Sequence, residues 1–201
     1  MIEPGVIVAA SGNRKKAREL EELLRGTRWQ VKSLAEFPGI VAPEETGTTF
    51  EANARLKALY YAEKTGHACL ADDSGLVVDY LNGEPGVNSA YYAGPQGDDE
   101  ANNAKLLAAL RDVPWHLRTA RFVCCAAVAF PGNPEVHFEW GEVEGHIAVA
   151  PFGSNGFGYD PLFVPLGYEE TFGELDPAVK HHLSHRGRAL ERIRAWLESL
   201  S

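Results

Sequence analysis

Residues 68–76 read ACLADDSGL, and the predicted fold is built outward from this stretch. A short apolar run bounded by turn-forming residues is typical of a buried strand. We expect this strand to end at Asp72 and Asp73, with a further strand over residues 76–81. Two carboxylates at a buried strand end are costly unless a cation, a ligand or solvent compensates them. The carboxyl ends of strands are where open α/β sheets bind ligands, although a solvated Asp-Ser-Gly turn explains the same residues without one.

Length and composition limit the class of protein. The chain has 201 residues, enough for one domain or two closely packed lobes. A net charge of −9 argues against a protein that coats a nucleic-acid backbone, but it leaves room for a single nucleotide. No apolar run approaches the roughly 20 residues that span a bilayer, and the first residues lack the features of a signal peptide. The three cysteines, Cys69, Cys124 and Cys125, stand in apolar runs and suit a reduced, cytoplasmic protein.

The N-terminal region has the pattern of an anion-binding turn. A buried strand over residues 5–10 is followed by Ser11, Gly12 and Asn13 and by a helix over residues 14–25. A strand, a glycine turn and a helix present backbone N–H groups to an anion. Lys15 and Lys16 fall in the first helical turn, where the helix dipole does not favour cations and a bound anion would. A plain turn with solvent-facing lysines is the alternative.

The remaining elements are predicted from periodicity and turn chemistry. We expect an alternating strand over 136–140 with one exposed face, and a glycine bulge or bend at residue 141. The other predicted strands cover 29–34, 122–130 (apolar and central) and 162–164. The other predicted helices are one opened by a capping box at Thr48 and ending at Gly66, one capped by residues 98–99, one capped by Asp176, and a final helix after residues 184–188. We expect a turn at 82–83, a loop over 86–97 and a glycine-rich loop over 151–161.

Taken together, these features describe a site for a magnesium nucleotide. Two acidic pairs, Glu44-Glu45 and Asp72-Asp73, suit Mg²⁺, which prefers oxygen ligands and binds substrate phosphates. The cations suit a polyphosphate, and the glycine-rich loop with its aromatic residues suits a base. Histidines 181, 182 and 185 have a spacing that could hold zinc, but exposed histidines on a helix that begins with proline are the simpler explanation and the one we favour.

Four blocks of the sequence, spread from the first strand to the last helix, resemble the inosine triphosphate pyrophosphatase family. They are SGNRKK at 11–16, EETG at 44–47 with Phe50, Asn53 and Lys57, ADDSGL at 71–76, and GFGYDP at 156–161 with SHRG at 184–187. The resemblance implies one α/β domain over 1–201, a long curved mixed β-sheet flanked by helices in two lobes, with the active site in the cleft between them. It also implies a homodimer that hydrolyses ITP, dITP and XTP, with Mg²⁺, to the monophosphate and pyrophosphate.

The same resemblance assigns site residues. Asp73 matches the general base and a metal ligand, and Glu45 matches the second acidic metal position, with the adjacent Glu44 left open. The matched substrate contacts are Ser11, Gly12, Asn13, Arg14, Lys15, Lys16, Lys57, Ser74, Phe157, Gly158, Tyr159, Asp160, Lys180, His185 and Arg186. Of these, His185 and Arg186 are expected to donate hydrogen bonds to the 6-oxo group of a purine. Adenine has an amino donor at this position and cannot accept these hydrogen bonds.

One departure and two rival functions accompany this interpretation. Family members commonly have an aromatic residue where this chain has Asn88 and a basic residue where it has Tyr91, which puts the strength of phosphate binding in question. A nucleotide-binding protein without turnover is one alternative, opposed by the intact acidic pairs. A hydrolase of other nucleotides is the second, opposed by the SHRG block.

Overall fold

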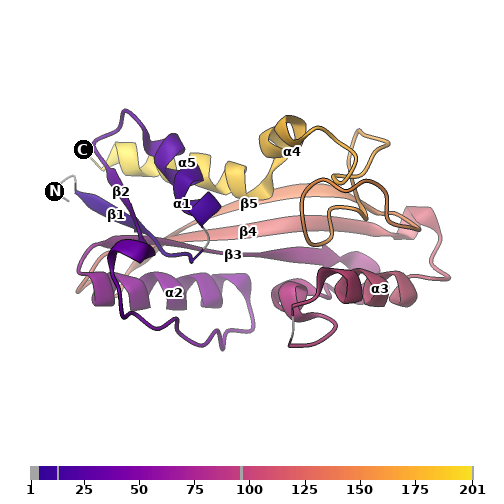
Figure 1. Cartoon of the computed structure of the whole chain (residues 1–201), viewed down its shortest axis with the longest axis horizontal. Helices are drawn as coiled ribbons and strands as arrows, with labels where there is room; N and C mark the ends of the chain where they lie inside the picture. The colour runs from indigo at the N-terminus through magenta and orange to yellow at the C-terminus, as the bar shows by residue number, and fades with distance from the viewer. Residues whose placement is uncertain (1–4, 13, 96, 201) are drawn as a thin grey trace. The chain divides into compact units, whose positions relative to one another are not determined.

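A computed structural model describes residues 5–12, 14–95 and 97–200 and contains one six-stranded sheet (Figure 1). The strand order is β2-β1-β3-β4-β5-β6. The strands are β1 (Val6–Ala9), β2 (Gln30–Ser33), β3 (Ala68–Val78), β4 (Thr119–Ala129), β5 (Val136–Ile147) and β6 (Phe163–Pro165). β1 runs parallel to β2 and β3, whereas β5 and β6 are antiparallel. The expected mixed sheet with flanking helices is therefore confirmed.

Five α-helices accompany the strands in the described residues: α1 (Arg14–Leu24), α2 (Phe50–Thr65), α3 (Asp99–Ala109), α4 (Pro177–Leu183) and α5 (His185–Ser199). Short 3₁₀ helices span Leu34–Glu36, Asp79–Leu81, Gly86–Tyr91 and Trp115–Leu117. The helix caps follow from the sequence: Asp98 and Asp176 accept from the first turns of α3 and α4, and Gly66 ends α2 in the left-handed conformation. Within the described part of the chain, no helix has the length and apolarity to cross a membrane.

The chain divides into two compact units. Unit 1 comprises residues 1–73, 124–140 and 188–201, and unit 2 comprises residues 74–123 and 141–187. Each unit has its own apolar core. In unit 2 the core joins Leu76 and Phe122 of the sheet with Leu106 of α3 and the chain around Phe163 and Phe172.

In unit 1, helices cover both faces of the sheet. Even-numbered residues of β3, such as Leu70, pack with α1 and α5, whereas odd-numbered ones, such as Cys69, pack with α2. Figure 1 shows α1 and α5 on one side of these strands and α2 on the other. This alternation follows from the two-residue period of a strand, because successive side chains point to opposite faces.

The structure corrects several predicted boundaries. β3 does not end at Asp72 and Asp73 but continues to Val78, and residues 79–81, expected as strand, form a 3₁₀ turn. The cap of α2 is Thr49, whose side chain accepts from the Ala52 backbone, rather than Thr48. A 3₁₀ helix lies within the expected loop 86–97, and α5 begins at His185, inside the motif expected to precede it.

β5 also differs from its prediction. Residues 136–140 are all half-buried, and β5 continues through Gly141 to Ile147. The face expected to be exposed is covered because the His137 ring stacks on Trp196 of α5, with centroids 3.8 Å apart. On the other face, Phe138 and Trp140 pack against the core that α2 covers. Polar and apolar residues do alternate along 136–140, but the alternation of polarity does not imply that the polar face is exposed.

Candidate functional site

Asp72 and Asp73, adjacent in sequence, face opposite sides of the sheet. Asp72 binds Lys16 of α1, whose Nζ donates to Oδ2 at 2.7 Å. Asp73 instead meets α2 through Lys57 and Asn53. The continuous strand produces this separation, since a side chain on β3 must follow the two-residue alternation. The two carboxylates therefore belong to two different environments and do not form one acidic pair.

The Asp73 side is a cluster of two carboxylates around one ammonium group. Lys57 Nζ lies 3.0 Å from Glu45 Oε2 and 3.6 Å from Asp73 Oδ1. Asn53 Nδ2 donates to Asp73 Oδ2 at 3.2 Å, and Asn53 Oδ1 accepts from the Gly47 backbone at 2.7 Å. The loop carrying Glu45 is thereby tied to α2. Any residue with a Cβ at position 47 would meet Asn53 Oδ1 at 2.4 Å, so glycine is required for this approach.

The electrostatics of this cluster suit proton transfer. Burial raises the pKa of the Asp73 carboxyl above its ordinary value, although Lys57 and the Asn53 amide act in the opposite direction. Burial alone would lower the pKa of Lys57, but Asp73 and Glu45 outweigh it and the pKa is raised. Lys57 is therefore a firmly protonated cation, and Asp73 is a carboxylate with increased affinity for a proton. A perturbed pair of this kind is a hallmark of functional sites.

The sequence left Glu44 and Glu45 as alternatives, and the geometry distinguishes them. Both side chains are exposed, but Glu45 contacts the Lys57 ammonium and Glu44 has no such contact in the described structure. The structure also adds Asn53, which was not among the predicted site residues. Its position one helical turn before Lys57 could have revealed it, because residues four apart share a helix face.

The N-terminal turn is only partly described. Asn13 lies outside the described residues, between the exposed Gly12 and the start of α1 at Arg14. Arg14 and Lys15 are exposed, and Ser11 and Lys16 are half-buried. The Lys16 ammonium is engaged by Asp72, so it belongs to the opposite face of the unit 1 sheet from Lys57. Ser74 follows Asp73 on β3 and is half-buried.

Unit 2 contains the glycine-rich loop and its partners. Asp160 is buried, its carboxylate accepts from the Phe157 backbone at 2.9 Å, and it is paired with Lys180 of α4. Burial raises the pKa of Asp160, opposed by Lys180 and by the Phe157 N–H. The Phe157 side chain is 78% exposed, and Lys180 Nζ lies 4.7 Å from the centroid of its ring. An ordered loop thus presents an exposed aromatic face beside a cation.

The other predicted residues of unit 2 are more deeply placed. Tyr159 packs in the unit 2 core, and its hydroxyl donates to the Ser89 carbonyl at 2.7 Å. His185 stacks on Phe122 with centroids 5.2 Å apart. Arg186 is buried, and burial lowers its pKa to about 10. Two residues that no sequence pattern indicated, Asp99 and Asn103 of α3, bind the backbone of Gly158.

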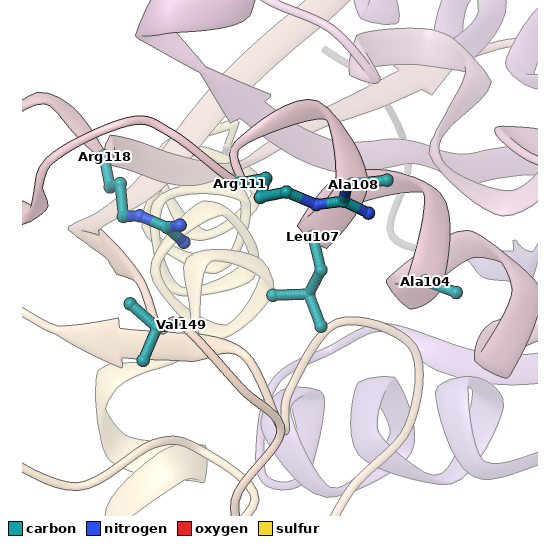
Figure 2. Close-up of a pocket in the computed structure, with 6 residues that line it drawn as sticks. All are labelled: Ala104, Leu107, Ala108, Arg111, Arg118 and Val149. Carbon is teal, nitrogen blue, oxygen red and sulfur yellow. The ribbon is translucent and has the colours of Figure 1, made fainter.

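A hollow of about 400 Å³ lies elsewhere in unit 2, over α3 (Figure 2). Its lining is Ala104, Leu107, Ala108, Arg111, Arg118 and Val149, and it includes no predicted site residue. Arg118 is buried there and donates to the carbonyls of residues 110, 113, 147 and 148. Its guanidinium therefore joins the end of α3 to the end of β5 as a structural group. Within the described residues, no three His, Cys, Asp or Glu side chains converge on a metal position.

These observations define a class: a mixed α/β protein whose unit 1 holds a lysine ammonium between two carboxylates, one of them partly buried. The sequence model of the Ham1 family matches residues 7–196. The chain belongs to the Ham1 family.

Relatives and solved structures agree with this membership. A dITP/XTP pyrophosphatase from Desulforamulus reducens is 51% identical over 194 residues, covering 96% of each chain. One from Oceanobacillus iheyensis is 45% identical over 195 residues, covering 96% of this chain and 98% of the relative. The structure of a HAM1 protein from Coxiella burnetii is 42% identical and superposes with a TM-score of 0.91, covering 96% of this chain and 98% of that one. The resemblance inferred from four sequence blocks is therefore confirmed.

Proposed function

We propose that this protein is a hydrolase that converts aberrant purine nucleoside triphosphates (ITP, dITP and XTP) to the monophosphate and pyrophosphate. The observation that carries the proposal is the convergence of Glu45, Lys57 and Asp73 within 3.6 Å contacts, because it unites two of the four matched blocks in one cluster. The relatives named dITP/XTP pyrophosphatase support the substrate class. Removing such nucleotides would cleanse the nucleotide pool.

The residues at Asp73 fit a magnesium ion. Oxygens of Glu45 and Asp73 both contact the single Lys57 ammonium, so they already converge on one positive charge. Two carboxylates are a suitable set, since Mg²⁺ keeps several waters and takes further ligands from substrate phosphates. Asp73 and Glu45 would hold the ion, with Glu44 as the lesser candidate. When bound, Mg²⁺ neutralises phosphate charge and acidifies a coordinated water.

The chain's own residues have distinct roles in the proposed reaction. Asp73 orients a water and accepts its proton as the oxygen attacks the α-phosphorus. The bond between the α-phosphorus and the bridging oxygen then breaks, and pyrophosphate leaves with that oxygen. Lys16 and Lys57 neutralise charge on the triphosphate, together with the N-terminal turn from Ser11 to Lys15. Without substrate both lysines form ion pairs with carboxylates, so the triphosphate must compete with these carboxylates for the ammonium groups.

Base selection is proposed for unit 2 residues. Phe157 offers its exposed ring for stacking, with Lys180 and Asp160 beside it. His185 and Arg186 donate to the 6-oxo group of hypoxanthine or xanthine. Adenine carries an amino donor at that position, and a buried donor facing a donor is strongly unfavourable. Ser74 is an additional substrate contact next to the base Asp73.

We further propose a homodimer of single 201-residue domains that works in the cytoplasm. The three buried free cysteines are consistent with a reducing compartment. Sedimentation at micromolar concentration tests the dimer, and a species with the mass of one chain would contradict it.

A panel of triphosphates with Mg²⁺ tests the proposed activity directly. Pyrophosphate and orthophosphate are assayed separately for ITP, dITP, XTP, ATP and GTP. We expect pyrophosphate as the first product and much faster hydrolysis of ITP, dITP and XTP than of ATP. Orthophosphate as the first product would overturn the mechanism, and equal turnover of ATP would overturn the substrate class. Binding of ITP without turnover would favour the non-catalytic alternative.

A further inference from the structure

Two side chains of α3 bind the backbone of one residue of the glycine-rich loop, Gly158. Asp99 Oδ2 accepts from the Gly158 N–H at 2.8 Å, and Asn103 Nδ2 donates to the Gly158 carbonyl at 3.0 Å. Asp99 and Asn103 are four residues apart, so they project from the same face of the helix. The helix thus matches both hydrogen-bonding groups of a single residue that lies more than fifty positions away in sequence.

The rest of this turn is also fixed to unit 2. Asp160 accepts from the Phe157 N–H at 2.9 Å, and the Asp160 N–H donates to the Phe157 carbonyl at 3.2 Å. Gly158 itself has φ +61°, a left-handed conformation that glycine adopts without strain. Ordering a loop residue costs conformational entropy. The hydrogen bonds from α3 and Asp160 offset this cost before any ligand arrives.

The Phe157 side chain is exposed, although the backbone of this turn is held by hydrogen bonds. Its backbone is held on both sides, yet its ring is among the most exposed large apolar groups of the described protein, at 78%. Aromatic rings gain most from stacking when they need not be ordered on binding. An exposed ring on a backbone that is already fixed is therefore preorganised to stack on a planar ligand such as a nucleobase.

We propose that Asp99 and Asn103 are positioning residues for the nucleobase. By holding Gly158 they orient the neighbouring Phe157 ring toward the purine, and they act through the loop without touching the substrate. This inference rests on the proposed function, which assigns Phe157 to the base. It adds α3, an element outside the four matched blocks, to the machinery that selects substrate.

The test separates the base from the phosphates by using two probes. Inosine monophosphate carries the base without a polyphosphate, and inorganic pyrophosphate with Mg²⁺ represents the polyphosphate without the base. Calorimetric titration of Asp99→Ala and Asn103→Leu should show binding of inosine monophosphate weakened about 3- to 10-fold for each, the range of one lost hydrogen bond. Binding of pyrophosphate should be unchanged. With ITP, KM should rise by a similar factor while kcat changes by less than about twofold.

Two further variants serve as controls. Glu100→Ala removes a neighbouring acid from the same helical turn, and Glu100 has no contact to the loop in the described structure, so it should bind both probes like wild type. Asp99→Asn keeps an acceptor for the Gly158 N–H and should recover most of the affinity lost in Asp99→Ala. Thermal unfolding establishes that each variant is folded, and Asn103→Ser replaces Asn103→Leu if leucine prevents folding.

The outcomes distinguish this inference from the function on which it rests. If the wild-type protein releases no pyrophosphate from ITP, the proposed function fails whatever the variants do. If it does, equal losses for both probes, or no loss for either, would show that α3 only stabilises unit 2. Failure of the wild-type protein to bind inosine monophosphate at millimolar concentration would also overturn the proposal, because a prepared base site requires it.

Discussion

Asp73 and Asp72 differ in environment although they are neighbours, and this difference can be tested one residue at a time. Asp73→Asn keeps the shape and removes the charge and the basicity. We expect at least a ~10²-fold loss of turnover, the usual range for a general base, with an unchanged unfolding midpoint. Asp72→Asn is the comparison variant: Asp72 binds Lys16, a proposed triphosphate contact, so its loss should raise KM for ITP more than it lowers turnover. A larger loss for Asp72→Asn than for Asp73→Asn would assign the base to Asp72.

Arg186 is the second residue with a sharp expectation. Because it is buried, Arg186→Met preserves volume better than alanine while removing the donors. Losing one donor to the 6-oxo group should cost about 1–3 kcal/mol with ITP and almost nothing with ATP. The ratio of kcat/KM for ITP to that for ATP should then fall roughly ten- to a hundredfold. Arg188→Met, at an exposed position two residues on, is the control, and equal losses for both substrates would contradict the role in base selection.

Residue types near the site were predictable where a local pattern marks them. Asn53, Lys57 and Asp73 all stand in the matched blocks, and helical spacing also places Asn53 on the same face of α2 as Lys57. Asp99 and Asn103 could not be predicted, because they contact Gly158 at separations of 59 and 55 residues. Their partners are also backbone groups, which every residue has, so no residue type marks the contact. The contact of Glu45, rather than Glu44, with Lys57 likewise could not be predicted, since a loop has no fixed side-chain period.

At the scale of elements, close approach makes some glycines indispensable and others replaceable. A Cβ at Gly145 of β5 would lie 2.2 Å from the Val164 carbonyl oxygen of β6, whereas one at Gly187 of α5 would meet only ordinary contacts. Gly145→Ala should therefore destabilise the protein by at least about 1–3 kcal/mol, as in overpacked cores. Gly187→Ala should stabilise it by about 0.5–1 kcal/mol, because alanine favours a helix. Urea unfolding measures both, and a neutral Gly145→Ala would show that β6 moves freely away from β5.

The prediction of elements succeeded where hydrophobic period and caps agree. α3 is marked by its Asp98 cap, and β4 by an unbroken apolar run. The main error concerned β3, because Asp-Asp-Ser-Gly has the composition of a turn and yet lies within a strand of eleven residues. Lys16, Lys57 and Asn53 compensate the two carboxylates from opposite faces, and these tertiary contacts override the local turn preference.

At the scale of the whole molecule, the protein is held together without covalent cross-links. All three cysteines are free and buried. Burial raises the pKa of Cys69 to about 11 and that of Cys125 to about 12, so their thiolates are scarce at neutral pH. We expect no reaction with a thiol reagent at pH 8 in the native protein and reaction of all three after denaturation. Reducing agent should leave the unfolding midpoint unchanged. Rapid reaction of any native thiol would show that unit 1 opens readily.

The uninterrupted course of β3 has a consequence for how the site can move. Asp73 lies in the interior of β3 but beyond the part that pairs with β1, whereas residues 68–70 have β1 on one side and β4 on the other. Amide hydrogens in such a position exchange with solvent only when the sheet itself opens. Hydrogen–deuterium exchange should therefore find the amides of residues 68–70, just before Asp73, among the slowest of the chain, and the loop around Glu45 much faster. The proposed base would then be a fixed reference point, and the adjustments that accommodate one nucleotide or reject another would fall to the loops that approach it.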